Sequence, residues 1–381
     1  MIDVLTNRWT LRALGVIAMG RAFLRYTNPR RKRSGRAQTA FYERTWREAA
    51  EQLGGTCVAL GSEICQINVG NQRTRVVHNV CAIDDPVTLA VLHDKPITHR
   101  ILQDVGVPVP RHCVFTTKSV AKAAAFLRDL GGDCVVKPAG GTGGGRGVTT
   151  GIRTRWQLSR AAAAAAVYAD ELLIEEQVEG ENYRLLYLDG ELVDAFVRRR
   201  PAVVGDSRST VAKLVHEHNE QRLKSGTAIS QVLLTIDLDM RRTLAKQGLS
   251  LRSVPEAGKQ VVLKTAINEN SGADNSTATH LLCRSIVEDG ARAVRALGSR
   301  FAGIDLVTRD PALPLAETGG VVIEVNGTPN LYYHYNKSDG VYPAAIEVLK
   351  RVLRDIPSSP PEERRVKYPS PVERAAVATV N

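Results

Sequence analysis

A glycine-rich loop with a lysine at its edge is the stretch of this sequence best suited to chemistry. Residues 134–136 form a short apolar run that leads to Lys137, and six of the eight residues from 140 to 147 are glycine. Ordering so many glycines costs conformational entropy. Their small size lets backbone N–H groups approach the phosphate oxygens of a ligand. The sequence therefore predicts a phosphate-binding loop.

This loop connects two strands rather than a strand and a helix. A second β-like run follows at residues 148–150, and Arg146-Gly147 stands where a Walker A loop requires Lys-Ser/Thr. We therefore expect the loop to lie over a nucleotide as a flap. A flexible surface hairpin or linker is the alternative, although a linker needs neither the flanking strands nor the lysine.

Two carboxylates and an amide on later strand-like segments form the second candidate group. Asp305 lies in the middle of an apolar run, where a carboxylate is costly to bury unless a cation or hydrogen bonds satisfy it. Glu324 and Asn326 are two residues apart, so their side chains point to the same face of a strand. Three such oxygen ligands suit Mg²⁺ that is shared with substrate phosphates; an ion-paired structural set is the alternative.

Helices and strands alternate along the chain and must position these residues. Their order indicates two small α/β units followed by a mixed antiparallel sheet with helices on one side. The predicted helices cover residues 41–53, 86–92, 94–105, 118–130, 154–169, 211–223, 237–247, 277–297 and 342–353. The predicted strands cover residues 56–60, 64–69, 73–78, 113–116, 134–136, 148–150, 172–176, 183–188, 192–199, 301–307 and 321–325.

The composition is that of a soluble globular protein with a surplus of positive charge. The chain has 381 residues, of which 43% are hydrophobic, and a net charge of +11, which favours anionic ligands. Its six cysteines form no CxxC pair, as expected of free thiols in a reducing cytoplasm. No apolar run approaches the ~20 residues that span a bilayer, and no signal peptide is evident. We therefore expect a cytoplasmic enzyme.

The length suggests several domains, and we predict five segments. They are a basic N-terminal arm or helix (1–36), a small N-terminal α/β domain (37–92), a central subdomain with the glycine flap (93–180), a carboxy-terminal subdomain with the metal site (181–355) and a disordered tail (356–381). Residues 1–26 read as a helix. The basic run at residues 30–36 could bind nucleic acid, an acidic lipid surface or an acidic substrate, and we favour a solvated terminus.

Several sequence blocks between residues 93 and 350 resemble the ATP-grasp superfamily, and most closely the ATP-grasp domain of cyanophycin synthetases. The resemblance implies an α+β and α/β fold in which two α+β subdomains grip the nucleotide, preceded by the small N-terminal domain. In family order, the blocks are His93-Asp94-Lys95, Gly106-Val107-Pro108-Val109-Pro110, Val136-Lys137-Pro138 with the glycine loop, Glu175-Glu176-Gln177-Val178, Asn182-Tyr183-Arg184, Arg199-Arg200-Pro201, Gly303-Ile304-Asp305 and Glu324-Val325-Asn326.

The resemblance implies a ligase in which ATP phosphorylates a carboxylate and an amine attacks the acyl phosphate. It implies ATP and Mg²⁺, or else Mn²⁺, and small carboxylate and amine substrates such as amino acids or peptides. By position in the motifs, Lys95, Lys137, Gly143, Gly144, Gly145, Arg146 and Gly147 match the phosphate site, Glu175, Glu176 and Val178 the adenine hinge, and Asn182 the ribose position. Arg184, Lys264 and Asn268 match positions around the transferred phosphate, and Asp305, Glu324 and Asn326 match the metal ligands.

The sequence departs from the family pattern at several points. Asn182 replaces an acidic residue, Lys264 replaces an arginine, and Asn330 stands where relatives usually have glycine. These changes leave the nucleotide chemistry in place but can alter the acceptor pocket. The chain also lacks the Mur-ligase-like domain of cyanophycin synthetases, so we expect a stand-alone amino acid or peptide ligase.

Two other functions remain open. A kinase would stop at phosphoryl transfer, and a regulatory protein would retain nucleotide affinity while its basic N-terminus binds nucleic acid. We favour the ligase, and no general base for the amine emerges from the histidines. The sequence leaves homo-oligomerisation open.

Overall fold

The computed structural model describes residues 29–61, 63–141, 145–224, 233–267, 269–270 and 274–356. The predicted helix at residues 1–26 and the predicted tail beyond residue 356 lie outside the described residues. So do three of the candidate site residues, Gly143, Gly144 and Asn268.

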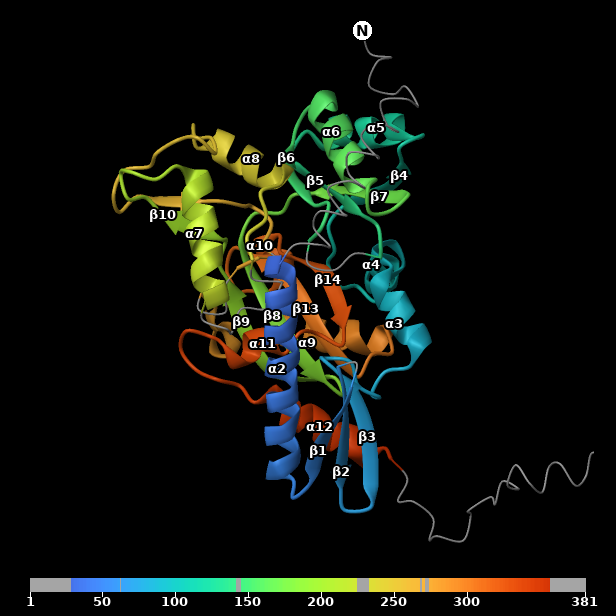
Figure 1. The fold of residues 1–381 in the computed structure, drawn as a ribbon. Helices are drawn as coiled ribbons and strands as arrows, with labels where there is room; N and C mark the ends of the chain where they lie inside the picture. The colour runs from blue at the N-terminus through green and yellow to red at the C-terminus, as the bar shows by residue number, and fades with distance from the viewer. Residues whose placement is uncertain are drawn as a thin grey trace, which may run out of the picture.

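The first described unit is a long helix packed on a three-stranded antiparallel sheet, at the foot of the molecule (Figure 1). Its elements are α2 (Pro29–Gln52), β1 (Thr56–Gly61), β2 (Ile64–Val69) and β3 (Gln72–Val77). Tyr42 and Trp46 of α2 are almost fully buried against this sheet and the C-terminal helix α12 (Ala344–Arg354). The predicted boundary at residue 36 falls inside α2, because proline is tolerated at the first helical position and Arg and Lys are good helix formers.

A second unit contains the glycine loop. Helices α3 (Pro86–His93) and α4 (Lys95–Asp104) lead into a four-stranded sheet of order β4-β7-β5-β6, in which every pair is antiparallel. The strands are β4 (His112–Thr116), β5 (Cys134–Pro138), β6 (Thr149–Ile152) and β7 (Glu171–Glu176). Helices α5 (Val120–Leu130) and α6 (Arg155–Ala165) cover one face with a core of leucines, alanines and Phe115. As predicted, the glycine loop connects two neighbouring strands.

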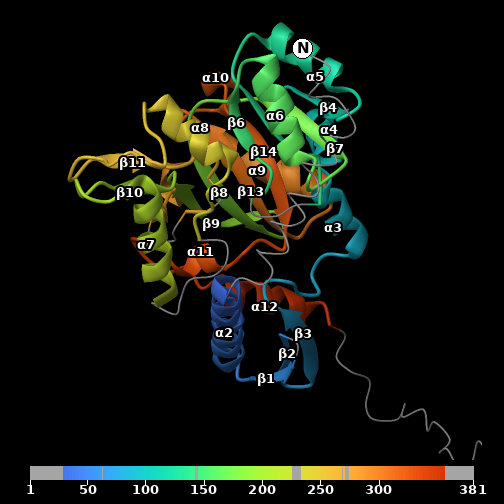
Figure 2. The same ribbon diagram turned by 45° about the horizontal axis from the view of Figure 1, so that its top comes forward.

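The third unit is a five-stranded antiparallel sheet of order β12-β9-β8-β13-β14. The strands are β8 (Glu181–Leu188), β9 (Glu191–Arg198), β12 (Ser276–Thr277), β13 (Phe301–Thr308) and β14 (Val321–Gly327). One face packs on α9 (Arg284–Ala296) and on residues of α3 and α4. The other face packs at one end on α2, α12 and the short helix α11 (Tyr332–Tyr335), and its remainder faces the second unit (Figure 2).

Two sequence predictions are wrong in this unit. Helices cover both faces of the sheet rather than one, because Leu186, Phe196 and Phe301 form a second apolar surface that α2 and α12 bury. The predicted helix at residues 277–297 begins only at Arg284: residues 276–277 pair with β9, and a short 3₁₀ helix, η3 (Thr279–Leu281), follows.

A side lobe projects between β9 and β12. It consists of β10 (Ala202–Val204), α7 (Val211–Lys224), α8 (Leu238–Lys246) and β11 (Gln260–Val262) around a small apolar core of its own. Helix α8 is tied to β6, since Asp239 accepts hydrogen bonds from the N–H and hydroxyl of Thr150 at 3.0 and 2.7 Å. The lobe therefore contacts the sheet that carries the glycine loop. The short α10 (Leu315–Thr318) lies before β14.

All six cysteines are free, as expected, and Cys65, Cys81 and Cys134 are buried. No helix in the described part of the chain is long and apolar enough to cross a membrane.

Candidate active site

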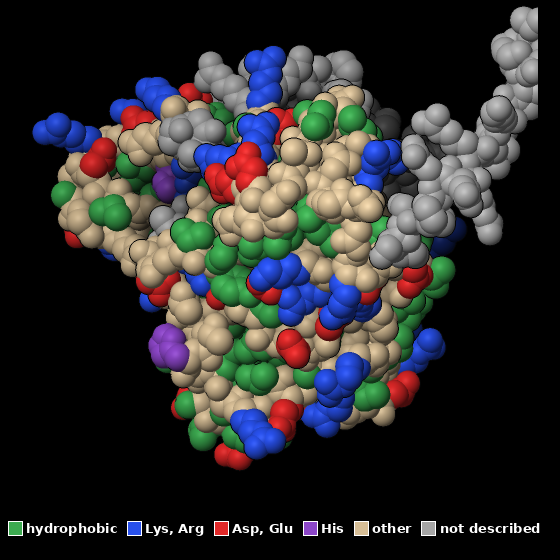
Figure 3. Space-filling view, turned by 90° about the horizontal axis from the view of Figure 1, so that it is seen from below, with side chains coloured by type: hydrophobic (Ala, Val, Ile, Leu, Met, Phe, Trp, Pro, Cys, Tyr) green, Lys and Arg blue, Asp and Glu red, His purple; other side chains and the backbone are tan. Residues whose placement is uncertain are grey.

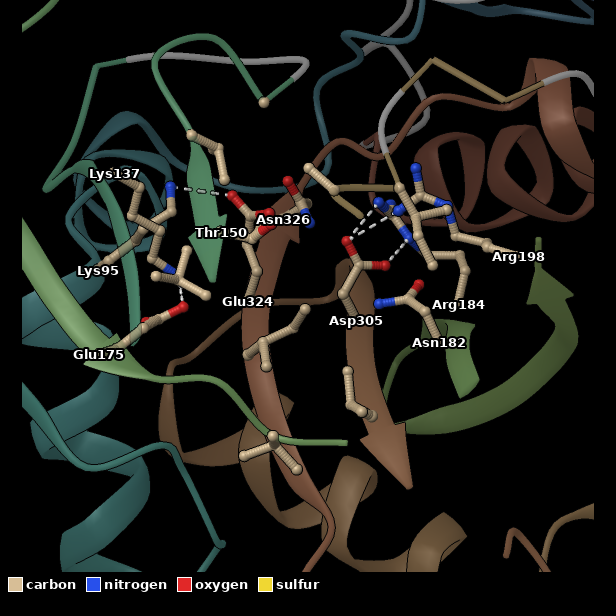
Figure 4. A pocket seen from close by; sticks show the side chains of 18 of the residues that line it. Lys95, Lys137, Thr150, Glu175, Asn182, Arg184, Arg198, Asp305, Glu324 and Asn326 are labelled. Carbon is tan, nitrogen blue, oxygen red and sulfur yellow. Dashed lines mark hydrogen bonds and ion pairs between the residues drawn. The ribbon is translucent and has the colours of Figure 1, made fainter. Parts of the chain in front are cut away.

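A cavity of about 360 Å³ lies where the four-stranded and five-stranded sheets face each other (Figure 4). Most of its described lining comes from the glycine loop, strands β5 and β7, the segment after β7, and residues on one face of β8, β9, β13 and β14. Of the candidate site residues, the lining includes Lys95, Lys137, Gly145, Glu175, Glu176, Val178, Asn182, Arg184, Asp305, Glu324 and Asn326. The structure thus brings together residues more than 200 positions apart in sequence.

Lys95 joins the start of α4 to the strand β14. It follows Asp94, which caps the helix by accepting a hydrogen bond from the N–H of Ile97 at 2.9 Å. The Lys95 ammonium lies 3.0 Å from the carboxylate of Glu324, and this ion pair raises the lysine pKa. Its backbone N–H also donates to the carbonyl of Ala139 at 3.1 Å, which fixes the start of the glycine loop. The lysine is therefore a permanent cation at the base of the loop.

The second lysine, Lys137, forms a buried ion pair with Glu175 on strand β7. The Lys137 ammonium lies 2.7 Å from the Glu175 carboxylate, and both side chains are less than a tenth exposed. The neighbouring β5 and β7 strands present them to the cavity (Figure 4). The second carboxylate oxygen of Glu175 is buried and has no partner among the described residues.

An arginine pair occupies the other side of the cavity. Arg184 on β8 lies directly opposite Asp305 on β13 and donates to it twice, at 2.5 and 2.9 Å. Arg198 on β9 donates to the same carboxylate at 3.2 Å. Gly303 makes room for this arrangement, since a Cβ atom there would lie 2.7 Å from the Arg184 guanidinium. One carboxylate thus orders two guanidinium groups.

The three predicted metal ligands share one face of neighbouring strands. Asp305 is paired with Glu324 across β13 and β14, and Asn326 is opposite Gly303. Burial alone would raise the pKa of Glu324, but Lys95, Lys137 and Arg184 together lower it to about 2. It is therefore an anion at neutral pH. A set of two carboxylates and one amide oxygen on a single face has the donor chemistry that fits Mg²⁺.

Several buried polar atoms at the cavity have no partner in the described part of the chain. They are the amide oxygen of Asn182, Nε of Arg198 and the hydroxyl of Tyr333, besides the Glu175 oxygen. Buried polar groups are normally hydrogen-bonded, so unsatisfied donors and acceptors around a cavity indicate a polar ligand. The donors lie beside the arginine pair, since the Arg198 guanidinium stands 5.9 Å from the Tyr333 ring.

The described residues of the glycine loop are divided between the cavity and the surface. Gly145 and Val148 line the cavity, whereas Gly147 packs against Pro138 and Tyr168, and Arg146 is exposed. At Gly140 a Cβ atom would lie 2.9 Å from the carbonyl of His93, so only glycine allows this close approach to the end of α3.

Lys264 does not reach the described wall of the cavity, although its neighbour Thr265 does. Its side chain is 1% exposed, and its ammonium lies between the carboxylates of Asp237 and Glu269, at 2.6 and 2.7 Å. The two ion pairs raise its pKa against the effect of burial. Lys264 thus fixes the side lobe to the segment that lines the cavity, and its predicted contact with the transferred phosphate stays a prediction.

Sequence reasoning gave no role to several residues of the cavity wall, among them Asn79, Thr150, Arg198, Thr328 and Tyr333. Arg198 carries the same two-residue alternation as the rest of β9, which could have placed it on the face of Arg184. Nothing in the sequence signals Asn79, which comes to the cavity only through the packing of α2 and α12.

The two facing sheets, the glycine loop between paired strands and the shared cavity define the class: the chain has the ATP-grasp fold, as its motifs predict. A solved structure of a bifunctional glutathione synthetase from Pasteurella multocida superposes with a TM-score of 0.51 at 25% identity, over 81% of this chain and 43% of that one.

Particular relatives are similar in sequence, and the predicted resemblance to cyanophycin synthetases is confirmed. The cyanophycin synthetase of a Nostoc species is 35% identical over 252 residues, which are 65% of this chain and 27% of that protein. That of a Synechocystis species is 30% identical over 72% of this chain and 32% of its own length. The glutathione biosynthesis bifunctional protein GshAB of Pasteurella multocida is 28% identical over 73% of this chain and 36% of its own length.

This chain thus spans about a third or less of the length of these curated relatives. No family model matches the chain.

Proposed function

We propose that this protein is an ATP-dependent carboxylate–amine ligase that forms an amide bond through an acyl phosphate. The observation that carries the proposal is the convergence of two lysines, two arginines and the set of Asp305, Glu324 and Asn326 on one cavity beside the glycine loop. The curated relatives are named as cyanophycin synthetases and as a glutathione biosynthesis bifunctional protein, which supports an amino acid or a peptide as substrate.

The nucleotide would lie across the lysine side of the cavity. Glu176, the last residue of β7, and Val178, two residues later, line the wall where the adenine would bind. Lys95 and Lys137 would release their carboxylate partners to hold phosphate oxygens, since phosphates offer concentrated negative charge. The unsatisfied amide oxygen of Asn182 would accept a ribose hydroxyl.

Mg²⁺ is the ion that we propose for Asp305, Glu324 and Asn326, and Mn²⁺ is an alternative with similar oxygen ligands. A bound divalent ion would neutralise charge on the phosphates and align them for transfer. The residues of the chain hold this set in place without it, because Lys95 and the arginine pair already orient both carboxylates.

Arg184 and Arg198 would stabilise the transferred phosphoryl group and the carboxylate that receives it. The carboxylate oxygen attacks the γ-phosphorus and ADP leaves. The amine nitrogen then attacks the acyl carbon, phosphate leaves, and the amine proton passes to solvent or to the departing phosphate. Preplaced cations lower the barrier because negative charge builds up on the transferred group. The glycine loop would exclude water from the acyl phosphate.

The cytoplasm is the compartment that we propose, because all six thiols are free. On the face seen in Figure 3, Lys and Arg side chains are interspersed with acidic and hydrophobic ones rather than gathered in one field. That face gives the nucleic-acid alternative no support.

The test is a screen for ADP release with amino acids and short peptides, offered in pairs with Mg·ATP. The ligase proposal expects release only when a carboxylate and an amine are both present, whereas a kinase needs no amine. Glu324→Ala should abolish turnover because it removes a metal ligand and the partner of Lys95. The exposed Glu191→Ala serves as the control. Normal turnover by Glu324→Ala would refute the site assignment.

A further inference from the structure

We propose that the N-terminal unit selects the amine substrate, through a neutral wall formed by Asn79, Thr328 and Asn330 at the cavity. All three line the cavity, and Asn79 is its only described lining residue from before α3. The inference rests on the proposed ligase function and deepens it, since it assigns the chemical class of the amine. This class is a primary amine of an amino acid or peptide without an additional positive charge.

The N-terminal unit is tightly fixed to the segment that follows β14. The hydroxyl of Tyr42 on α2 donates to the Asn330 side chain at 2.7 Å and accepts from the N–H of Leu331 at 3.2 Å. Trp46 donates to the carbonyl of His78 at 2.7 Å, which holds the turn that carries Asn79. Tyr42 and Trp46 are 2% and 1% exposed. The unit is therefore part of the cavity wall and not a separate appendage.

Thr328 sits in an unfavourable backbone conformation at this wall. Its φ of +44° lies in the left-handed region, which a β-branched residue rarely adopts. Two contacts hold it there: the side-chain amide of Asn79 donates to its carbonyl, and its N–H donates to Phe301 at 3.2 Å. Strained residues of this kind persist where the surroundings impose them, most often at functional sites.

The chemistry of the wall suits an uncharged amine. The Asn79 amide uses an N–H on Thr328, which leaves its oxygen as an acceptor, and the Thr328 hydroxyl is a second acceptor. An attacking amine must be unprotonated, and its N–H groups can donate to both. The three wall residues carry no carboxylate, and the carboxylates of Asp305 and Glu324 elsewhere in the lining are already paired with Arg184, Arg198 and Lys95. A second ammonium on the substrate would therefore lose its hydration without gaining a counter-ion.

The experiment compares wild type with Asn79→Ala, Asn79→Asp and Thr328→Gly. Asn71→Ala, an exposed asparagine in the β2–β3 turn, is the matched control. The probes are alanine and glycinamide as neutral-side amines, and lysine and putrescine as amines with an extra cation. Amine binding is measured by isothermal titration to protein loaded with Mg²⁺ and a non-hydrolysable ATP analogue, and KM is measured by ADP release.

We expect Asn79→Ala to weaken binding of the neutral-side amines at least tenfold while affinity for the nucleotide changes less than twofold. Asn79→Asp should shift the preference toward lysine and putrescine. Thr328→Gly should weaken amine binding while the melting temperature stays equal or rises, because glycine adopts positive φ without strain. A purely structural role would instead lower the melting temperature and leave the amine preference unchanged.

The outcomes separate the two proposals. If wild type binds amines more tightly than Asn79→Ala does but releases no ADP with any pair of substrates, the proposed ligase function is refuted and the proposed amine-binding wall is supported. If wild type turns over and Asn79→Ala binds amines as wild type does, or if wild type binds cationic and neutral amines equally, the wall is refuted.

Discussion

The buried ion pair between Lys137 and Glu175 makes a prediction that separates folding from ligand binding. Replacing Lys137 by methionine keeps the volume but leaves the Glu175 carboxylate, which is 4% exposed, without its cation. At 2.7 Å and an effective dielectric constant near 20, the direct attraction is about 6 kcal/mol before desolvation is subtracted. Removing one partner of such a pair typically costs about 3–5 kcal/mol of stability.

The double variant Lys137→Met/Glu175→Gln should recover most of that loss. Replacing both members of a buried pair by neutral groups of similar volume is often close to neutral, so we expect a net change of about 0–2 kcal/mol. The coupling free energy between the two sites should then be at least about 2 kcal/mol. The Lys137→Met variant and the double variant should nevertheless both lose affinity for Mg·ATP, because each lacks the lysine cation that faces the cavity.

Two assays check this reasoning. Urea unfolding followed by circular dichroism gives the apparent free energy of unfolding of wild type, both single variants and the double variant. Isothermal titration with a non-hydrolysable ATP analogue gives nucleotide affinity. The reasoning is refuted if the double variant is as unstable as the sum of the single ones, or if it binds the nucleotide as tightly as wild type.

Two further predictions concern the site and the fold. The pKa of Glu324 is lowered to about 2 in the folded protein. The ionised carboxylate therefore stabilises the fold fully above the unfolded pKa of 4.5, and this stabilisation is lost as the pH falls toward 2. Its side chain is a third exposed, so wild type should lose only about 1–2 kcal/mol more than Glu324→Gln across this range in acid-unfolding curves. Gly290→Ala should lower the free energy of unfolding by about 1–3 kcal/mol, because its Cβ would lie 2.1 Å from the Tyr187 hydroxyl. Gly132→Ala, which meets no neighbour, is the control, and equal melting temperatures for the two would contradict the packing on α9.

The strands that contain the candidate site residues were predicted better than the pairing of these strands with each other. Glu324 and Asn326 share a face because alternation along a strand is a local property. Their pairing with Asp305 depends on the register of β13 against β14, which includes an irregularity just after Asp305. A one-residue slip would have turned the two carboxylates to opposite faces. Register of this kind is set by packing across the whole sheet, so the grouping rested on the ligand chemistry of the residues and on the motif resemblance.

The residues that escaped prediction come from contacts between distant segments. Asn79 reaches the cavity because Tyr42 and Trp46 bury α2 against the end of the main sheet. The resemblance places Lys264 near the transferred phosphate, and this stays a prediction. Nothing local in the sequence predicted that its buried ammonium also lies between Asp237 and Glu269, which α8 and the segment after β11 bring to it. Neither contact has a local sequence signal.

The cavity keeps every described carboxylate of the predicted metal and lysine sites paired with a cation. Glu324 holds Lys95, Glu175 holds Lys137, and Asp305 holds both arginines. Under the proposed function these pairs must exchange partners together: each cation turns to a phosphate oxygen while Glu324 and Asp305 turn to the metal ion. A nucleotide without the ion would free the carboxylates beside its own phosphates and be repelled by them. The ion pairs would therefore couple the binding of ATP to that of the ion, and this coupling would account for the many acidic groups in a site proposed for polyanions.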